Sequence, residues 1–300
     1  MSKNPKTIDE QIALLKERGM SFKKETNAHH FLSNISYYRL KGYWWEMQKD
    51  IVNHQFKENS FFENVIDLYN FDRNFRLIVF NAIERIEIAL RAKMIYYLSL
   101  SYGGEWYIES TLFPNQKFHN QFKYKIEKEL SDSSEEFIQK HIKKHPNERP
   151  EAWKALEVIT LGSLSKLYNN INHQLSEKNI IAKEFGLYNQ KYLSSWLQTI
   201  TVIRNIIAHH SRLWNRVIIN KYSWPNQTIS PLLNYTPNDY DRRKIFPILS
   251  AIIYLNNHIS PGHSIKTELI KLFADFKVPL YKMGFPEDWN LQPIWKTEEL

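Results

Sequence analysis

The chain has 300 residues, of which 43% are hydrophobic and 24% are charged, and it contains no cysteine. This composition suits a globular protein with a sizeable core, and it excludes a mainly disordered chain, disulfides and thiolate metal sites. Forty Lys and Arg against 32 Asp and Glu give a net charge of +8, which favours an anionic partner such as nucleic acid.

The local signals predict an all-α fold, because the chain has only eight glycines and its helix stop signals lie far apart. The first residues, MSKNPKTIDEQ, lack the apolar core of a secretory signal, so we expect a cytoplasmic protein. Thr7 and Glu10 have the spacing of a capping box that opens a helix, and Gly19 closes that helix.

The segment ISYYRLKGYWW, residues 35–45, interleaves aromatic residues with cations. Such side chains can stack on the bases and bind the phosphates of single-stranded RNA. About half of them must nevertheless face the core, and we favour this structural role for the segment as a whole. Tyr38, Arg39 and Lys41 are the residues that we expect to contact RNA.

A long apolar segment opens with a second capping box, Ser60 to Glu63, and ends at Gly103 and Gly104. We expect Asp72 to restart a helix inside it. Buried charges in such a segment must be paired, and Glu87 and Arg91, at i and i+4, can pair directly. We favour a structural ion pair, and the alternative is that the pair supports a functional site.

Further helices are predicted from the residue after Pro114 to Leu130 and within SDSSEEFIQKHIKKHP, residues 131–146. Another helix begins at Pro150 and is interrupted at Gly162, a short helix then ends at Gly186, and a last one runs from Tyr192 to Val217. Residues 218–239 are rich in Pro, Asn and Ser and predict an extended connector. Two more helices and an irregular tail follow. We therefore place an all-α domain at residues 1–217, the connector at 218–239 and a helical appendage at 240–300. The longest apolar run, IFPILSAIIYL, is shorter than the roughly 18 residues of a membrane span, so we expect no membrane partner.

The helix predicted from 192 to 217 carries the string RNIIAHHSRLWNR, residues 204–216. On a helical wheel at about 100° per residue, its aliphatic residues fill one arc and its arginines the opposite arc. His209 falls on the polar face, between Asn205 and Arg212. His210 falls in the middle of the apolar face, and we expect it to be a packed core residue.

His209 and its neighbours suit phosphate chemistry. An imidazole can move a proton near neutral pH, and arginines such as Arg212 and Arg216 can bind phosphate. Together they could cleave RNA without a metal, since a base takes the proton of the 2′-hydroxyl and a cation stabilises the phosphorane. We expect no metal and no cofactor, because adjacent histidines point to opposite faces and no nucleophile or phosphate-loop motif occurs.

Arg204 and His209 lie about 140° apart around a helix and about 7 Å apart along it, so they do not meet within one helix. A two-fold dimer could set His209 of one chain beside Arg204 of the other. We therefore expect a homodimer.

The string RNIIAHHSRLWNR resembles the signature of the Abi family of abortive-infection proteins, the AbiD/AbiF-like group. Arg204 to His209 also fit the R-N-x-x-x-H form of the R-x4-6-H motif of the HEPN superfamily. Three further segments resemble the Abi family in the same order, namely residues 35–45, 68–91 and 153–168. The resemblance covers about two thirds of the chain.

This resemblance implies a HEPN-like helical bundle, usually dimeric, here with additional N- and C-terminal helices. It implies metal-independent RNA cleavage that leaves a 2′,3′-cyclic phosphate, in bacterial defence against phage. By position, Arg204 would hold the phosphate, His209 would act as acid and base, Asn205 would orient the site and His210 would support it. Two alternatives remain open: a module that binds RNA or protein without cutting, and a toxin kept inactive by a noncoding RNA or a protein antitoxin.

Overall fold

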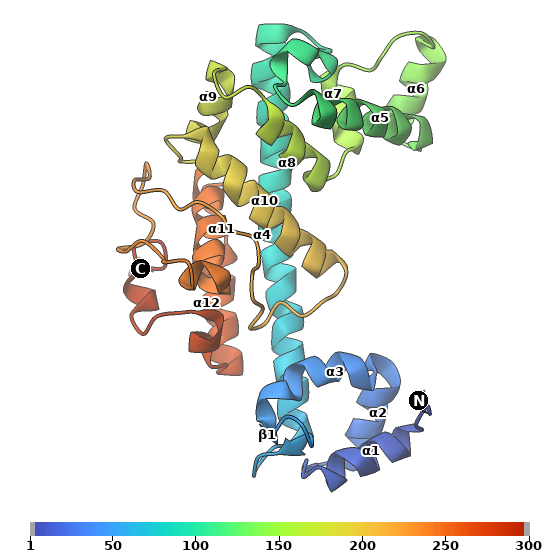
Figure 1. The fold of residues 1–300 in the computed structure, drawn as a ribbon, viewed down its shortest axis with the longest axis vertical. Helices are drawn as coiled ribbons and strands as arrows, with labels where there is room; N and C mark the ends of the chain where they lie inside the picture. The colour runs from blue at the N-terminus through green and yellow to red at the C-terminus, as the bar shows by residue number, and fades with distance from the viewer. Residues whose placement is uncertain (1–3, 297–300) are drawn as a thin grey trace. The chain divides into compact units, whose positions relative to one another are not determined.

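The computed structural model describes residues 4–296 and confirms the all-α class. Within that range it has twelve α-helices and one two-stranded sheet (Figure 1). The chain forms two compact units: residues up to Leu77 with Leu269–Val278, and Ile78–Glu268 with residues from Pro279 onward. The boundaries expected from the sequence at residues 217 and 239 stay a prediction.

The first unit holds the N-terminal helices, the sheet and parts of two longer helices. Its elements are α1 (Ile8–Glu17), α2 (Glu25–Ile35), α3 (Tyr37–Trp44), β1 (Gln48–Asp50), β2 (Gln55–Phe56), the first part of α4 (Phe62–Tyr102) and most of α12 (Ile265–Phe276). The strands are antiparallel, with Gln48 opposite Phe56 and Asp50 opposite Gln55. The sequence did not predict this sheet.

The second unit contains the rest of α4, and one of its other helices carries the start of the string RNIIAHHSRLWNR. Its other helices are α5 (Gln116–Asp132), α6 (Glu136–Lys144), α7 (Ala152–Ala155), α8 (Leu161–Asn170), α9 (Ser176–Glu184), α10 (Gln190–Ala208) and α11 (Ile245–Ile259). Short 3-10 helices occupy Trp45–Met47, Trp106–Ile108, Ser110–Leu112, Leu156–Val158, Asp241–Arg243, Leu280–Met283 and Trp289–Leu291. Residues 218–239 contain neither helix nor strand, as expected of an extended segment.

The first predicted capping box is confirmed and the second is wrong. At α1, the Thr7 hydroxyl accepts a hydrogen bond from the Glu10 N–H at 3.2 Å, and the Glu10 carboxylate accepts one from the Thr7 N–H at 2.7 Å. Gly19 follows the helix with φ of 90°. The Glu63 carboxylate instead accepts hydrogen bonds from the backbone N–H groups of residues 23 and 24 at 3.0 Å, so it joins the start of α4 to the segment before α2.

Asp72 does not restart a helix, because α4 runs without a break through this position. Its fully buried carboxylate accepts hydrogen bonds from the Tyr43 hydroxyl at 2.7 Å and from Arg76 Nε at 3.1 Å. Burial and the nearby Asp72 charge raise the pKa of Tyr43 far above its usual value, so its hydroxyl stays a donor. This buried polar group joins α3 to α4 within the first unit.

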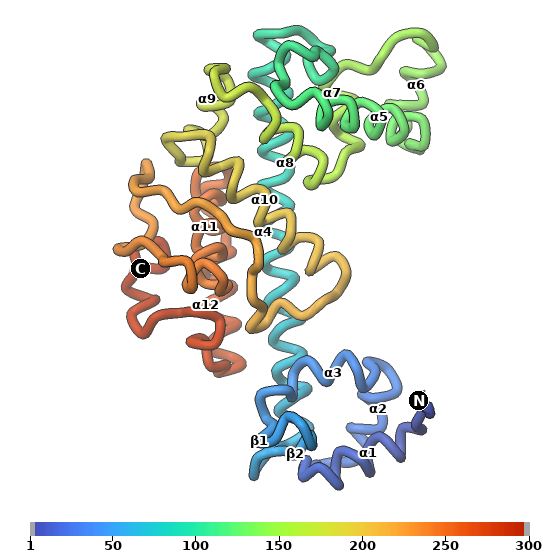
Figure 2. The backbone as a smooth tube through the Cα atoms, viewed as in Figure 1, coloured from blue at the N-terminus to red at the C-terminus, as the bar shows by residue number. Residues whose placement is uncertain are grey.

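The second unit is organised around α10, which packs against α8 and α11 (Figures 1 and 2). The Trp196 side chain of α10 is fully buried, and its Nε1 donates to the carbonyl of Ser223 at 2.9 Å. Gly186, between α9 and α10, has φ of 83°, and a Cβ there would lie 2.6 Å from the Tyr254 hydroxyl of α11. Only glycine therefore suits this close approach of the backbone to α11.

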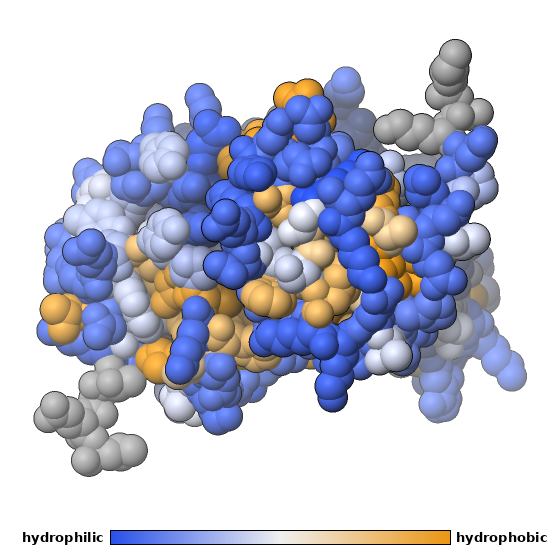
Figure 3. Space-filling model, turned by 90° about the horizontal axis from the view of Figure 1, so that it is seen from below, coloured by the Kyte–Doolittle hydropathy of each residue, from blue (hydrophilic) through white to orange (hydrophobic). Residues whose placement is uncertain are grey.

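No helix within residues 4–296 combines the length and apolar character needed to cross a membrane. Figure 3 shows one face of the molecule, where polar and charged residues surround a smaller group of apolar side chains. This mixture is ordinary for a protein surface, since apolar atoms make up much of any such surface.

Replacement of Arg76 tests the buried group in the first unit. We expect Arg76→Met to lower the free energy of unfolding by about 3 kcal/mol, because the buried Asp72 carboxylate loses the charged hydrogen bond from Arg76. The control is Arg73→Met on the exposed side of the same helix, with an expected change of about 0.5 kcal/mol or less. Urea denaturation measures both, and equal effects would contradict the assignment.

Candidate functional site at the end of helix α10

Local signals and burial together define α10. The Asn189 side chain caps its N-terminus by accepting a hydrogen bond from the Lys191 N–H at 2.9 Å. Its inward stripe is almost fully buried and consists of Leu193, Trp196, Leu197, Ile200, Ile203 and Ile207. This stripe fixes the rotation of the helix, so the polar residues between its members must face outward.

The helix ends at Ala208, nine residues before the predicted end at Val217. His210 has a left-handed backbone with φ of 54°. Its N–H donates to the carbonyl of Ile207 at 2.8 Å, and the Ser211 N–H donates to that of Ile206 at 2.9 Å. This is the Schellman pattern of helix termination, with histidine at the position that glycine usually holds.

Because α10 ends at Ala208, the side chains after it do not have the orientations expected of a continuous helix. His210 is exposed, so the prediction of a packed core histidine is wrong. Val217, also placed on the apolar face, is 46% exposed. Leu213 and Trp214 are buried, because the chain turns back toward the core after the left-handed residue. Leu213 lies with Ile203 around a gap too small for water.

Arg204, Asn205 and His209 all lie near the C-terminal end of α10. Asn205 and His209 are exposed and Arg204 is half-buried. Asn205 and His209 are four residues apart and share one side of the helix, whereas Arg204 lies on the adjacent side. Within residues 4–296, none of the three side chains makes a hydrogen bond or an ion pair with another residue. They are therefore available to a ligand or to another chain.

Arg212 and Arg216 follow the helix in an irregular segment, and both are half-buried. Arg216 Nη1 donates to the carbonyl of Arg212 at 3.4 Å. Asn215 between them has φ of 48°, a second left-handed turn within six residues of the first. The two arginines thus remain near the motif in sequence, but the helical face predicted for them does not exist.

The second group of predicted RNA-binding residues belongs to α3, in the first unit. Tyr38 is 81% exposed, and the Lys41 ammonium lies 5.9 Å from the centre of its ring and 5.8 Å from that of Trp45. Arg39 is also exposed, whereas Tyr43 is buried, as expected for part of the segment. Trp45, the first residue after α3, belongs to the same predicted segment but was not among the residues expected to contact RNA; it is 43% exposed and shares Lys41 with Tyr38.

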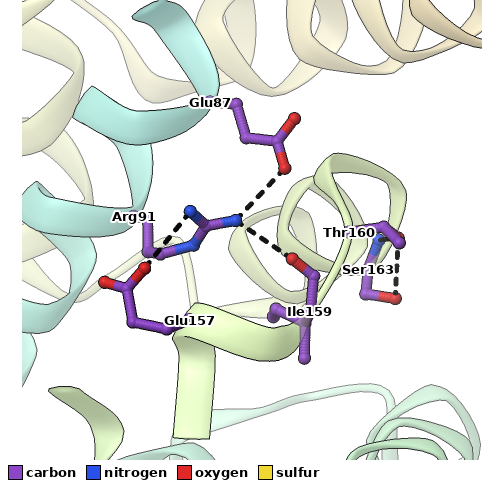
Figure 4. A network of polar contacts seen from close by, with 6 residues as sticks. All are labelled: Glu87, Arg91, Glu157, Ile159, Thr160 and Ser163. Carbon is purple, nitrogen blue, oxygen red and sulfur yellow. Dashed lines mark hydrogen bonds and ion pairs between the residues drawn. The ribbon is translucent and has the colours of Figure 1, made fainter. Parts of the chain in front are cut away.

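The predicted pair of Glu87 and Arg91 is confirmed, and Figure 4 shows its surroundings. Arg91 Nη2 donates to Glu87 Oε1 at 3.1 Å and to the carbonyl of Ile159 at 3.0 Å. Ile159 immediately precedes Thr160, whose hydroxyl caps the N-terminus of α8. Because α8 packs against α10, Arg91 holds the start of a helix that is a direct neighbour of the motif helix.

Within the part of the chain that the structure describes, no three His, Asp or Glu side chains are grouped so that they could hold a metal ion.

A comparison with protein families defines the class of this helical protein. The family described as Abi-like protein matches residues 30–215, which include α3, α4, α8 and the residues from Arg204 to His209 at the end of α10. The match covers more than half of the chain, so this chain belongs to the family of Abi-like proteins. No curated protein and no solved structure shows significant similarity to it.

The Arg91 contacts generate a stability prediction. We expect Arg91→Met to lower the free energy of unfolding by about 2 kcal/mol, because the Glu87 carboxylate and the Ile159 carbonyl both lose a charged donor. Glu157, the third partner of Arg91, is 46% exposed, so Glu157→Gln is the control and should cost less than about 1 kcal/mol. Urea denaturation measures both variants. An equal loss of unfolding free energy in Arg91→Met and Glu157→Gln would show that the bonds from Arg91 to Glu87 and Ile159 do not dominate its contribution.

Proposed function

We propose that this Abi-like protein is an abortive-infection RNA endonuclease that needs no metal and acts as a homodimer with a HEPN-type site. The observation that supports this most is the set of three outward side chains, Arg204, Asn205 and His209, without partners within residues 4–296. A base, a cation and an amide on one rigid helix end are the groups that phosphodiester cleavage by a 2′-hydroxyl requires.

In the proposed reaction, the His209 imidazole takes the proton of the ribose 2′-hydroxyl. The 2′-oxygen then forms a bond to phosphorus, and the bond from phosphorus to the 5′-oxygen breaks. The leaving 5′-oxygen receives a proton from the imidazolium, and a 2′,3′-cyclic phosphate remains. Arg204 binds the non-bridging oxygens, whose negative charge grows in the transition state, and Asn205 orients the phosphate by hydrogen bonding.

The positions of Arg204 and His209 favour a site built from two chains. A separation of five residues puts them on different sides of α10, about 7 Å apart along its axis. A two-fold axis beside this helix end would bring His209 of one chain to Arg204 of the other, and would form two equivalent sites.

The aromatic and cationic side chains on α3 support RNA as the ligand. An exposed tyrosine and tryptophan with a lysine between them can stack on unpaired bases and attract phosphate. A noncoding RNA or a protein antitoxin that covered Arg204 and His209 would keep such a nuclease inactive in the cytoplasm.

The enzyme is tested by incubating the protein with total cellular RNA in EDTA and mapping the cleaved ends. We expect the parent to leave cyclic phosphate ends. Arg204→Ala and His209→Ala should each cut at least about 100-fold more slowly, because each loses a group that acts on the transition state. Lys221→Ala, an exposed lysine outside the motif, is the control with unchanged activity. RNA that is bound but not cut would favour the non-cleaving module, and equal cutting by all variants would exclude this site.

The two-chain site is tested by mixing the two inactive variants. Arg204→Ala chains retain His209, and His209→Ala chains retain Arg204, so each mixed dimer has one complete site. After exchange of subunits at equal amounts, we expect activity to return to about one quarter of the parent value. A mixture that stays inactive although mixed dimers have formed, or a fully active monomer, would contradict the dimeric site.

A further inference from the structure

A cleft of about 400 Å³ lies in the second unit, away from the motif end of α10. It is bounded by the loop before α5, the end of α8, the start of α9 and the first half of α10. Its lining includes two lysines, a histidine and several amides but no aspartate or glutamate. A volume of this size is within the range of small-ligand sites, and the absence of acidic groups favours an anionic ligand.

Lys178 is the most informative residue of the cleft, because it is a nearly buried cation with 3% of its surface exposed. Its Nζ donates to the carbonyls of Ile171 at 2.7 Å and Asn169 at 3.0 Å, at the end of α8. Burial lowers its pKa to about 8, so the amine is still mostly protonated at neutral pH. Within residues 4–296 no carboxylate pairs with it.

Helix capping accounts for only part of this arrangement. The two carbonyls at the end of α8 use two donors of the Lys178 ammonium, which has three. They also carry only partial negative charge, whereas a buried cation is normally matched by a full one. The Lys178 ammonium also lies 5.5 Å from the centre of the Tyr168 ring, which carries no formal charge. An anion in the cleft would supply the missing charge.

The other side chains of the cleft suit a ligand that carries more than a phosphate. Lys191, in the first turn of α10, is exposed and lines the same cleft. The exposed amides of Asn169 and Gln198 make no side-chain hydrogen bond within residues 4–296. Amide groups match the donors and acceptors on the edges of nucleobases.

We propose that this cleft binds a nucleotide, with its phosphate at Lys178 and Lys191 and its base at Asn169 and Gln198. The nucleotide is either free or one unit of an RNA strand. The second form rests on the proposed nuclease function: Ser195 in the cleft and Arg204 lie nine residues apart on α10, about 14 Å along one axis. A strand that follows this helix would pass from the cleft to the motif.

Binding measurements distinguish a free nucleotide from one unit of an RNA strand as the ligand. The probes are 5′-AMP, measured by calorimetry, and a fluorescent oligoribonucleotide with 2′-O-methyl groups, which cannot be cleaved by its own 2′-oxygen, measured by anisotropy. Lys191→Glu and Gln198→Ala change exposed positions, so folding should be preserved, unlike in Lys178→Met. Lys183→Glu makes the same charge change on an exposed lysine of α9 outside the cleft and is the matched control.

We expect Lys191→Glu to raise the Kd of the bound probe about tenfold or more and Lys183→Glu to leave it within about twofold, because Lys191, unlike Lys183, would make a charged hydrogen bond to the phosphate. Selective loss of AMP binding supports a free nucleotide, and selective loss of RNA binding alone supports a strand unit. No binding of either probe, or equal effects of Lys191→Glu and Lys183→Glu, overturns the proposal.

Variants of the motif distinguish this proposal from the nuclease function. Arg204→Ala and His209→Ala should retain AMP binding if the cleft is a free-nucleotide site, whatever their cleavage activity. A parent protein that binds at the cleft but cuts no RNA would contradict only the nuclease. A parent that cuts RNA while its Lys191→Glu and Lys183→Glu variants bind alike would contradict only the cleft.

Discussion

The arrangement of the candidate site depends on the left-handed backbone of His210. This single residue ends α10 by the Schellman hydrogen bonds, and the chain that follows returns Leu213 and Trp214 to the core. The return anchors the far side of the turn, so the last turn of α10 is held from both directions. His209, directly before the turn, is thereby kept at the helix end with its side chain in solvent. A helix continued to Val217 would have buried His210 and carried the arginines along its outer face.

The helix that ends there is held by its neighbours on the opposite side. Its apolar stripe packs against α8 and α11, and the turn before α8 is held by the hydrogen bond from Arg91 to Ile159. The Glu87–Arg91 pair on α4 is thus joined to α10 through α8, by the Ile159 bond and the packing of the two helices.

The sequence predicted most helices because apolar spacing, caps and glycines are local signals, as at Thr7 and Gly19. It failed where a distant contact decides. RNIIAHHSRLWNR contains no glycine or proline, so nothing local marks the end at Ala208, and burial of Leu213 and Trp214 determines it. Asp72 was predicted to start a helix because aspartate is a common N-cap residue, whereas its side chain in fact contacts Tyr43, 29 residues away in the sequence. The candidate residues Arg204, Asn205 and His209 could be predicted because they stand in one short string. The cleft around Lys178 could not, because its lining comes from four segments that only the fold brings together.

Helix electrostatics act differently on an anion at the two ends of α10. The C-terminal end of a helix has partial negative charge, which disfavours a phosphate there unless cations offset it. Arg204, Arg212 and Arg216 provide that positive charge around the motif, and the Schellman bonds occupy two of the terminal carbonyls. The first turn of the same helix has the opposite partial charge, but the end of α8 in the same cleft is partially negative, so an anion there would depend on Lys178 and Lys191. A phosphate chain along α10 would thus meet lysines at one end and arginines at the other.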